Sequence, residues 1–227
     1  MESKKGMVCL KKQFAVVGLG RFGGSVCREL YKMGHEVLAI DINEERVHNF
    51  ANYSTHAVVA NATDENTLLS LGIRNFEYVI VAIGDNIQAS ILCTLLLKEL
   101  KVKHVWVKAQ NNYHHKVVEK IGADRIIHPE KDMGIRIAHY LVSEKIIDYI
   151  ELSPDYSIME LIASKKVANK TIAKLDIRAK YGCTILGIKR GDDVIITPFP
   201  DQLILENDIL ILIGQNNDLR VFEEEGL

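Results

Sequence analysis

A glycine-rich segment near the amino terminus constrains the fold of this chain more than any other feature. The sequence GLGRFGG (18–24) follows directly after the apolar run at 14–17. It matches the G-x-G-x-x-G pattern of a dinucleotide-binding β-α-β unit. In that unit Gly18 allows a tight turn out of the strand, Gly20 lets the backbone approach a pyrophosphate, and Gly23 lets the helix pack closely on the strand. The chain is therefore predicted to bind a nucleotide at this loop.

Strands and helices are predicted to alternate from Gln13 to about Lys145. The strands are continuous apolar runs, which is typical of a parallel sheet covered on both faces. We expect an α/β fold, a Rossmann-like doubly wound domain over 13–146 that includes a last helix as a hinge. The predicted strands are FAVVG, EVLAID, HAVVA, YVIVAIG, HVWVKA and RIIHP, and the predicted helices cover 21–33, 43–52, 65–71, 86–100, 112–121 and 131–145.

The pattern changes after this region. Short predicted strands at 146–152 and 157–163 precede a polar segment at 173–181. The hairpin CTILGIKRGDDVIITP, the strand DILILIG and a terminal helical turn follow. We therefore expect a second, small, strand-rich α+β domain over 150–227.

Composition narrows the function classes. The chain has 227 residues, 48% of them hydrophobic and 26% charged, with a formal net charge of −2. This balance argues against broad binding of nucleic acid or anionic membranes. No apolar run reaches the roughly 20 residues that a membrane-spanning helix requires, and no signal peptide is expected at the start. The four cysteines form no C-x-x-C motif, and Cys27 and Cys93 are expected to be buried free thiols in a cytosolic protein.

Asp41 ends the second predicted strand, about 20 residues after the glycine loop, where a ribose ligand belongs. Its carboxylate is expected to accept hydrogen bonds from ribose hydroxyls and to disfavour a 2′-phosphate. Ile42 and Asn43 come next in the chain and are expected to contact the sugar or the base. Phe22, in the glycine loop, is also expected to line the site.

Two further loops are expected at the same edge of the sheet. The loop after the third strand is predicted to lie beside adenine, although Asp64 could serve only as a helix cap. The loop after the fourth strand is predicted to close over the nucleotide. The residues concerned are Ala62, Thr63, Asp64, Ile83, Gly84 and Asn86.

Arg21 stands at the start of the first predicted helix, where a cation works against the helix dipole. Its presence suits a ligand with more negative charge than a pyrophosphate diester, because a guanidinium can bind a terminal phosphate with two hydrogen bonds. The alternative is an ordinary surface arginine. Lys108 and Glu130 lie near the ends of the fifth and sixth strands, where they could contact a polyphosphate or a metal ion, or form a solvated ion pair.

No catalytic machinery is visible in the sequence. The eight histidines fall in no catalytic or metal-binding signature, and no nucleophile-elbow, P-loop or zinc-protease motif occurs. The second domain is too small for a substrate domain. We therefore expect a nucleotide sensor that is not an enzyme. The alternatives are an NAD(H)-dependent oxidoreductase, an NAD(H)-responsive redox sensor and a transcription factor, and the last lacks a basic recognition helix.

The residues also carry a family resemblance. FAVVGLGRFGGSVCRELYKMGHEVLAIDINEERV, HAVVANATDENTL, YVIVAIGDN and ADRIIHPEKDMG resemble the N-terminal (TrkA-N) domain of the RCK family, the regulators of potassium conductance. RAKYGCTILGIKRGDDVIITPFPDQLILENDILILIG resembles its C-terminal (TrkA-C) domain, with Asn207-Asp208 where that pattern usually has Gly-Asp. Within the family, the chain is most similar to the cytosolic regulatory subunits of bacterial Ktr potassium transporters.

The resemblance implies an assembly and a mechanism. Homodimers would form an octameric ring on the cytoplasmic face of a membrane-embedded potassium-translocating subunit, with ATP activating and ADP inactivating the system. Arg21 would reach the terminal phosphate of the nucleotide on a neighbouring protomer, and Asp41 would hold the ribose. Glu130 would lie near the phosphates and be linked to Mg²⁺ or another cation. Only a group that contacts the additional phosphate of ATP can make the two nucleotides favour different ring shapes.

Two further implications concern the second half of the chain. Some members of the family bind cyclic di-AMP between two C-terminal domains, and the matching residues here are Ile177, Arg178, Ala179 and Pro198. The apolar stripe of the helix at 131–145 could join dimers, or it could simply face the core.

Overall fold

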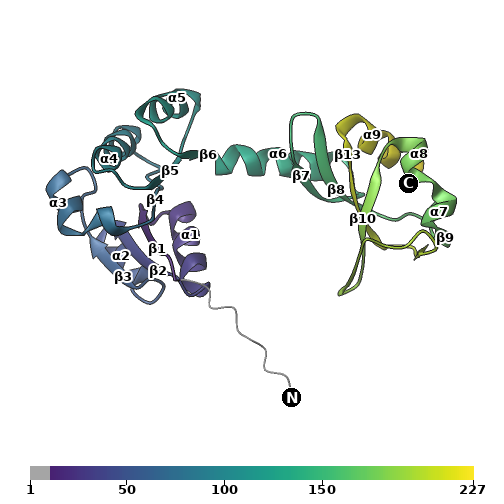
Figure 1. The fold of residues 1–227 in the computed structure, drawn as a ribbon, viewed down its shortest axis with the longest axis horizontal. Helices are drawn as coiled ribbons and strands as arrows, with labels where there is room; N and C mark the ends of the chain where they lie inside the picture. Colours follow the sequence, from purple (N-terminus) through teal and green to yellow (C-terminus); the bar gives the residue numbers. More distant parts are fainter. Residues whose placement is uncertain (1–10) are drawn as a thin grey trace, which may run out of the picture. The chain divides into compact units, whose positions relative to one another are not determined.

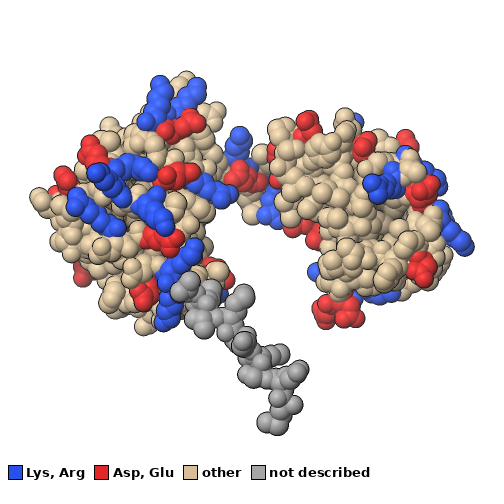
Figure 2. Space-filling view, viewed as in Figure 1, with Lys and Arg blue, Asp and Glu red and all other residues tan. Residues whose placement is uncertain are grey.

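The computed structural model describes residues 11–227 in two compact units, divided after Pro129 (Figure 1). Cys9 and the start of the chain, in which no signal peptide is expected, lie outside the described residues. Each unit has its own hydrophobic core. Within residues 11–227, no helix combines the length and the apolar character needed to cross a membrane. Both signs of charge are interspersed on the face of each unit that Figure 2 shows.

The first unit is built on a parallel six-stranded sheet with the order β3-β2-β1-β4-β5-β6. The register pairs Val17 of β1 with Ile40 of β2 and with Val81 of β4, so these three strands end at the same edge. This arrangement confirms the predicted doubly wound fold. The strands are β1 Gln13–Val17, β2 Glu36–Asp41, β3 His56–Val59, β4 Tyr78–Val81, β5 His104–Lys108 and β6 Arg125–Ile127.

Helices cover both faces of this sheet (Figure 1). On one face, a core cluster that includes Leu68, Leu97 and Val118 joins the sheet to α3, α4 and α5. On the other face, a cluster that includes Cys27 and Phe50 joins the sheet to α1 and α2. The helices are α1 Arg21–Lys32, α2 Glu44–Phe50, α3 Glu65–Ser70, the short η1 Ile73–Asn75, α4 Ile87–Glu99 and α5 Asn112–Ile121.

Most of these helices are capped by a side chain. Asn43, Asp64, Asn86 and Asn111 accept a hydrogen bond from the first turn of α2, α3, α4 and α5, respectively. Among the α-helices of this unit the exception is α1, which starts after Gly20 and has neither a capping side chain nor an acidic residue in its first turn.

The second unit contains an antiparallel sheet with the order β11-β10-β13-β8-β7 and a small β9–β12 pair. Its core includes Leu161, Ile188, Leu212 and Phe222, and the strand-rich α+β prediction is confirmed. The elements are α6 Pro129–Val142, β7 Ile146–Glu151, β8 Tyr156–Ile162, β9 Lys170–Thr171, α7 Ile172–Leu175, α8 Ile177–Tyr181, β10 Thr184–Arg190, β11 Asp193–Ile196, β12 Leu203–Ile204, β13 Ile209–Gln215, α9 Asn216–Val221 and η2 Phe222–Gly226.

The turn before β13 explains the departure from Gly-Asp. Asn207 has a φ of 66°, in the left-handed region where asparagine is the best tolerated residue besides glycine. Asp208 is buried, and its carboxylate accepts hydrogen bonds from Arg190 at 2.7 and 2.8 Å and from the Leu205 N–H at 2.8 Å. Burial alone would raise the pKa of Asp208, but these hydrogen bonds hold it below the usual range.

Helix α6, the predicted hinge, begins at Pro129, a residue well suited to the first helical position. Arg136 of α6 forms an ion pair of 2.7 Å with Asp148 of β7, and Tyr140 donates a hydrogen bond to the same carboxylate. None of the residues of α6 is fully buried. The assignment of this helix to the nucleotide-binding domain, and its role in joining dimers, stay predictions.

The cysteines in the described part of the chain, Cys27, Cys93 and Cys183, are free and buried, which confirms the prediction for the first two. Burial raises the pKa of the Cys27 thiol to about 11 and that of Cys93 to about 12. Both thiols are therefore protonated and unreactive near neutral pH.

Candidate nucleotide-binding site

A cavity of about 300 Å³ opens at the carboxyl edge of the parallel sheet. It lies where the strand order reverses around β1, which is the ligand-binding position of doubly wound sheets. Most of the residues expected from the sequence line it together: Gly18, Gly20, Arg21, Phe22, Asp41, Ile42, Ala62, Thr63, Ile83, Gly84, Asn86 and Lys108.

The glycine loop shapes one wall of this cavity. Gly18 has a φ of 93° and donates its N–H to the Ile40 carbonyl at 2.8 Å. A Cβ on Gly23 would lie 1.9 Å from the Gly18 carbonyl oxygen, so only glycine lets α1 pack this closely. A Cβ on Gly20, in contrast, would meet no atom within 4 Å. The space beside Gly20 is therefore available to a ligand.

The amino terminus of α1 faces this space without a cap. The first N–H groups of a helix have no partner inside the helix, and together with the dipole they favour an anion. Arg21 is the first residue of α1, is exposed and lines the cavity. Within the described residues, its guanidinium makes no hydrogen bond or ion pair. This end of the cavity is suited to phosphate groups.

Asp41 ends β2 and is only 6% exposed. One carboxylate oxygen accepts the Leu19 N–H at 2.7 Å, and the other accepts the Asn43 N–H at 2.9 Å. These bonds fix the carboxylate at the cavity wall, next to the glycine loop. Each oxygen keeps a further lone pair with which it could accept a hydroxyl, as a ribose requires.

Arg46 was not identified from the sequence. It lies in α2, lines the cavity, and its guanidinium is 3.7 Å from Asp41 and 3.9 Å from Asp85. The only available signal was its position five residues after Asp41, which places it in the first turn of the next helix. Asp85 belongs to the loop after β4 that was expected to close over the nucleotide. The other lining residues that were missed are Val17, Ala60, Asn61, Ala82 and Ala89.

Three of the expected residues of the first unit do not line the cavity, and neither does Glu130 of the second unit. Gly23 acts through packing, as described above, while Asn43 and Asp64 cap α2 and α3. Asp64 accepts hydrogen bonds from the hydroxyl and the N–H of Thr67, and these bonds hold the pKa of its carboxyl below the usual range. Of the two roles considered for Asp64, the helix cap is the one visible in the structure.

The remaining expected residues lie at the ends of the later strands. Lys108 ends β5, with its ammonium 5.8 Å from the centre of the Phe22 ring. Glu130 is exposed in the first turn of α6, in the second unit. Within residues 11–227, no three His, Cys, Asp or Glu side chains gather closely enough to hold a metal ion. The predicted role of Glu130 toward a cation stays a prediction.

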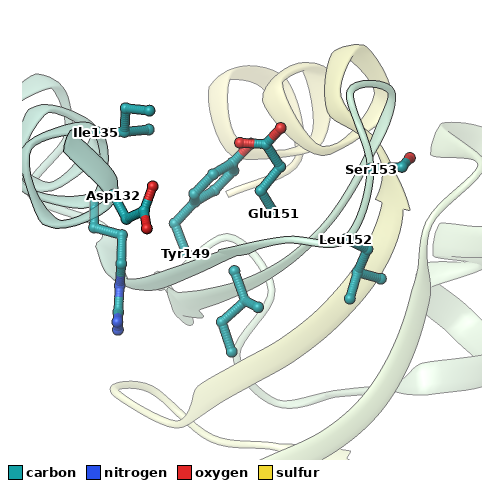
Figure 3. Close-up of a pocket in the computed structure, with 8 residues that line it drawn as sticks. Asp132, Ile135, Tyr149, Glu151, Leu152 and Ser153 are labelled. Atoms are coloured by element: carbon teal, nitrogen blue, oxygen red, sulfur yellow. The ribbon is translucent and has the colours of Figure 1, made fainter. Parts of the chain in front are cut away.

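The second unit has a cavity of its own, of about 340 Å³, between α6 and β7 (Figure 3). Asp132 and Ile135 of α6 face Tyr149 of β7 across it. The ring of Tyr149 also stacks on His139 with a centroid separation of 4.0 Å. Neither the glycine motif nor the resemblance predicted this cavity.

The residues expected to contact cyclic di-AMP line neither of these two cavities. Ile177 is buried in the core of the second unit, whereas Arg178 and Ala179 are exposed on α8. Pro198 is half-buried after β11. A site shared by two protomers at these residues stays a prediction.

Comparison with known proteins identifies both halves of the chain. Residues 14–129 match the TrkA-N domain family, and residues 157–225 match the TrkA-C domain family. The chain is 65% identical to the Ktr system potassium uptake protein A of Bacillus subtilis, over 95% of this chain and 97% of that protein. It is 55% identical to the Ktr system potassium uptake protein C of the same organism, over 96% and 99% of the two chains.

Solved structures agree on the fold. The crystal structure of the GsuK RCK domain matches with a TM-score of 0.53 and 24% identity, over 94% of this chain and 46% of that one. With a TrkA-N match over half of its length, a TrkA-C match in the remainder and relatives of this similarity, the chain belongs to the RCK family.

Proposed function

We propose that this chain is a nucleotide-sensing regulatory subunit of a potassium transporter, which ATP activates and ADP inactivates without turnover. The observation that carries the proposal is the cavity at β1. It combines the uncapped amino terminus of α1, the fixed carboxylate of Asp41 and the exposed guanidinium of Arg21. Relatives at 65% and 55% identity are Ktr system potassium uptake proteins, which supports the transport role.

The proposed recognition divides the nucleotide between these groups. The N–H groups of α1 receive the phosphates that ATP and ADP share, and Asp41 receives the ribose. Arg21 contacts the terminal phosphate of the ATP bound to a neighbouring protomer, as the resemblance implies. A ligand shifts a conformational equilibrium only through its different affinities for the two states, so Arg21 is the group able to distinguish ATP from ADP.

Mg²⁺ suits this arrangement as part of the ligand. It usually keeps several waters and binds through substrate phosphates with one or two carboxylates. The described residues offer no cluster of three metal-binding side chains. By the resemblance to the RCK family, Glu130 would contribute one carboxylate beside the phosphates.

The proposal includes an assembly. Dimers of this chain form an octameric ring that docks, on the cytoplasmic side, on a membrane-embedded potassium-translocating subunit. The residues Ile177, Arg178, Ala179 and Pro198 supply a second site, for cyclic di-AMP, between C-terminal domains. Both statements rest on the resemblance to the RCK family and on the relatives named above.

The decisive experiment titrates the full chain with ATP, ADP, NADH and cyclic di-AMP by calorimetry, with the mass followed by light scattering. Potassium flux is measured in vesicles that hold the membrane partner. We expect ATP and ADP to bind without hydrolysis and only ATP to open the flux. Arg21→Ala should keep its affinity for ADP and lose the preference for ATP. Arg74→Ala, an exposed arginine of η1 outside the cavity, is the matched control.

Two results would overturn parts of the proposal. If Arg21→Ala still separates ATP from ADP in the flux assay, Arg21 does not read the terminal phosphate. If NADH binds more tightly than either adenine nucleotide, the chain is a redox sensor or an oxidoreductase instead.

A further inference from the structure

Arg46 stands between two carboxylates that come from different loops. Its Nη1 lies 3.7 Å from Oδ2 of Asp41, at the end of β2, and its Nη2 lies 3.9 Å from Oδ2 of Asp85, after β4. The strands β2 and β4 flank β1 on opposite sides. The guanidinium therefore lies between loops from the two sides of the crevice.

This position belongs to the base end of the cavity and not to the phosphate end. The phosphate end is formed by the start of α1, with Gly20 and Arg21. Arg46 instead rises from α2 and reaches past Asp41, the residue placed for the ribose, toward the loop after β4. A nucleotide bound in this order places its base beneath the guanidinium.

The walls below Arg46 suit a flat apolar ring. Ile42 lines the cavity and is 73% exposed, so its apolar side chain is open to contact with a ligand. Ala62, Ile83 and Ala89 add apolar surface around the same space. A guanidinium is planar and weakly hydrated, so it stacks readily on an aromatic face.

We propose that Arg46 covers the base of the bound nucleotide, stacked on the ring and held in place by Asp41 and Asp85. This inference rests on the proposed function, because it takes the ligand to be an adenine nucleotide. In this view Arg46 raises the affinity for either nucleotide and lengthens its residence time, while Arg21 distinguishes ATP from ADP. Loss of Arg46 should therefore weaken ATP and ADP by the same factor.

The test is calorimetry on the full chain with ATP, ADP and inorganic tripolyphosphate, which has no base. Arg46→Ala should weaken both nucleotides about 3- to 30-fold, the range of a cation–π contact, and tripolyphosphate less than about 2-fold. Arg46→Lys keeps the charge but loses the planar group, so it should bind ATP nearly as weakly as Arg46→Ala does. Arg74→Ala, outside the cavity, should match the wild type.

A second readout follows the base directly. With bound etheno-ADP, acrylamide should quench the base fluorescence more strongly in Arg46→Ala than in the wild type, which a merely structural effect on Asp41 would not cause. The inference fails if Arg46→Ala binds ATP with wild-type affinity or if Arg46→Lys has full affinity. It also fails if Arg46→Ala loses as much affinity for tripolyphosphate as for ATP. If the wild type binds no adenine nucleotide at all, the proposed function fails first.

Discussion

At the scale of single residues, Gly18, Gly20 and Gly23 of the glycine loop are each required for a different physical reason. Gly18 needs its positive φ, and Gly23 needs the absence of a Cβ because the Gly18 carbonyl lies in that space. Gly20 has an ordinary extended backbone and empty space beside it. Its glycine matters only when a ligand occupies that space.

This difference gives a paired prediction. The free energy of unfolding of Gly20→Ala should fall by only about 1 kcal/mol, the loss expected because alanine is a much poorer helix cap than glycine. Its affinity for ATP should fall about 10-fold or more, because the new methyl group takes the space that a phosphate needs. Gly23→Ala should destabilise the first unit by about 3 kcal/mol or more, because α1 must move away from β1.

Thermal unfolding by circular dichroism and calorimetric titration with ATP would measure both effects. Wild-type affinity in Gly20→Ala would show that no ligand approaches this backbone. A stable Gly23→Ala protein would show that α1 can shift without loss of the fold.

Sequence reasoning identified cavity-lining residues that belong to a motif and missed others, such as Arg46, that packing brings to the cavity. Asp41 and the glycines belong to a pattern whose spacing follows from the turn and the ribose, so they could be identified in advance. Arg46 reaches Asp85 only because β2 and β4 lie on either side of β1. That contact depends on the sheet order and on one rotamer of a long side chain, neither of which a linear spacing encodes.

At the scale of elements, α5 contains a buried titratable group. His114 is 2% exposed, and its Nδ1 accepts the Gln110 N–H at 3.3 Å. Within the described residues its Nε2 has no hydrogen-bond partner. Burial lowers the pKa of His114, and the nearby His128 lowers it further. His128 itself shares a contact of 2.8 Å with a ring nitrogen of His115.

The lowered pKa predicts a pH dependence of stability. The unfolded chain takes up a proton at His114 below a pH of about 6.5, where the folded chain does not yet do so. The stabilisation is therefore complete above that pH and is lost as the pH falls toward the folded pKa. The loss can reach about 1.4 kcal/mol per pH unit while only the unfolded state is protonated.

His114→Asn keeps an acceptor for the Gln110 N–H but cannot titrate. Urea unfolding of both proteins between pH 8 and pH 5 should show a smaller loss of stability in the variant. Parallel curves for the two proteins would mean that His114 has the same pKa in the folded and unfolded states. The difference between the two curves reports His114 together with its coupling to His128.

The longer elements could be predicted because periodicity and caps mark them. Each strand of the parallel sheet is an apolar run, and the capping residues Asn43, Asp64 and Asn86 mark the starts of α2, α3 and α4. The strands β9 and β12 are two residues long and pair with each other across more than 30 residues of chain. So short a segment has no periodicity of its own, and its structure comes entirely from the partner strand.

The whole molecule has separate hydrophobic cores in its two units. We therefore predict two transitions in scanning calorimetry. Saturating ATP should raise only the transition of the first unit, since a ligand stabilises the state that it binds. Asp208→Ala should lower only the transition temperature of the second unit, because it leaves Arg190 and the Leu205 N–H without their acceptor. The corresponding loss in the free energy of unfolding is about 1–3 kcal/mol.

A single transition that moves with both changes would contradict this prediction and show that the units unfold together. Asn207→Gly is the companion variant in the same turn. It should leave both transitions nearly unchanged, because glycine adopts the same positive φ.

The cavity beside β1 also has a consequence for what the proposed sensor would report. ATP and ADP compete for one place, since both need the start of α1 and the carboxylate of Asp41. Once the combined concentration saturates the cavity, the fraction of chains loaded with ATP depends on the ratio of the two nucleotides and on their relative affinities. This fraction then no longer depends on the total concentration of ATP and ADP. Such a subunit would follow the ATP-to-ADP ratio of the cell, and a proportional fall in both nucleotides would leave its output unchanged.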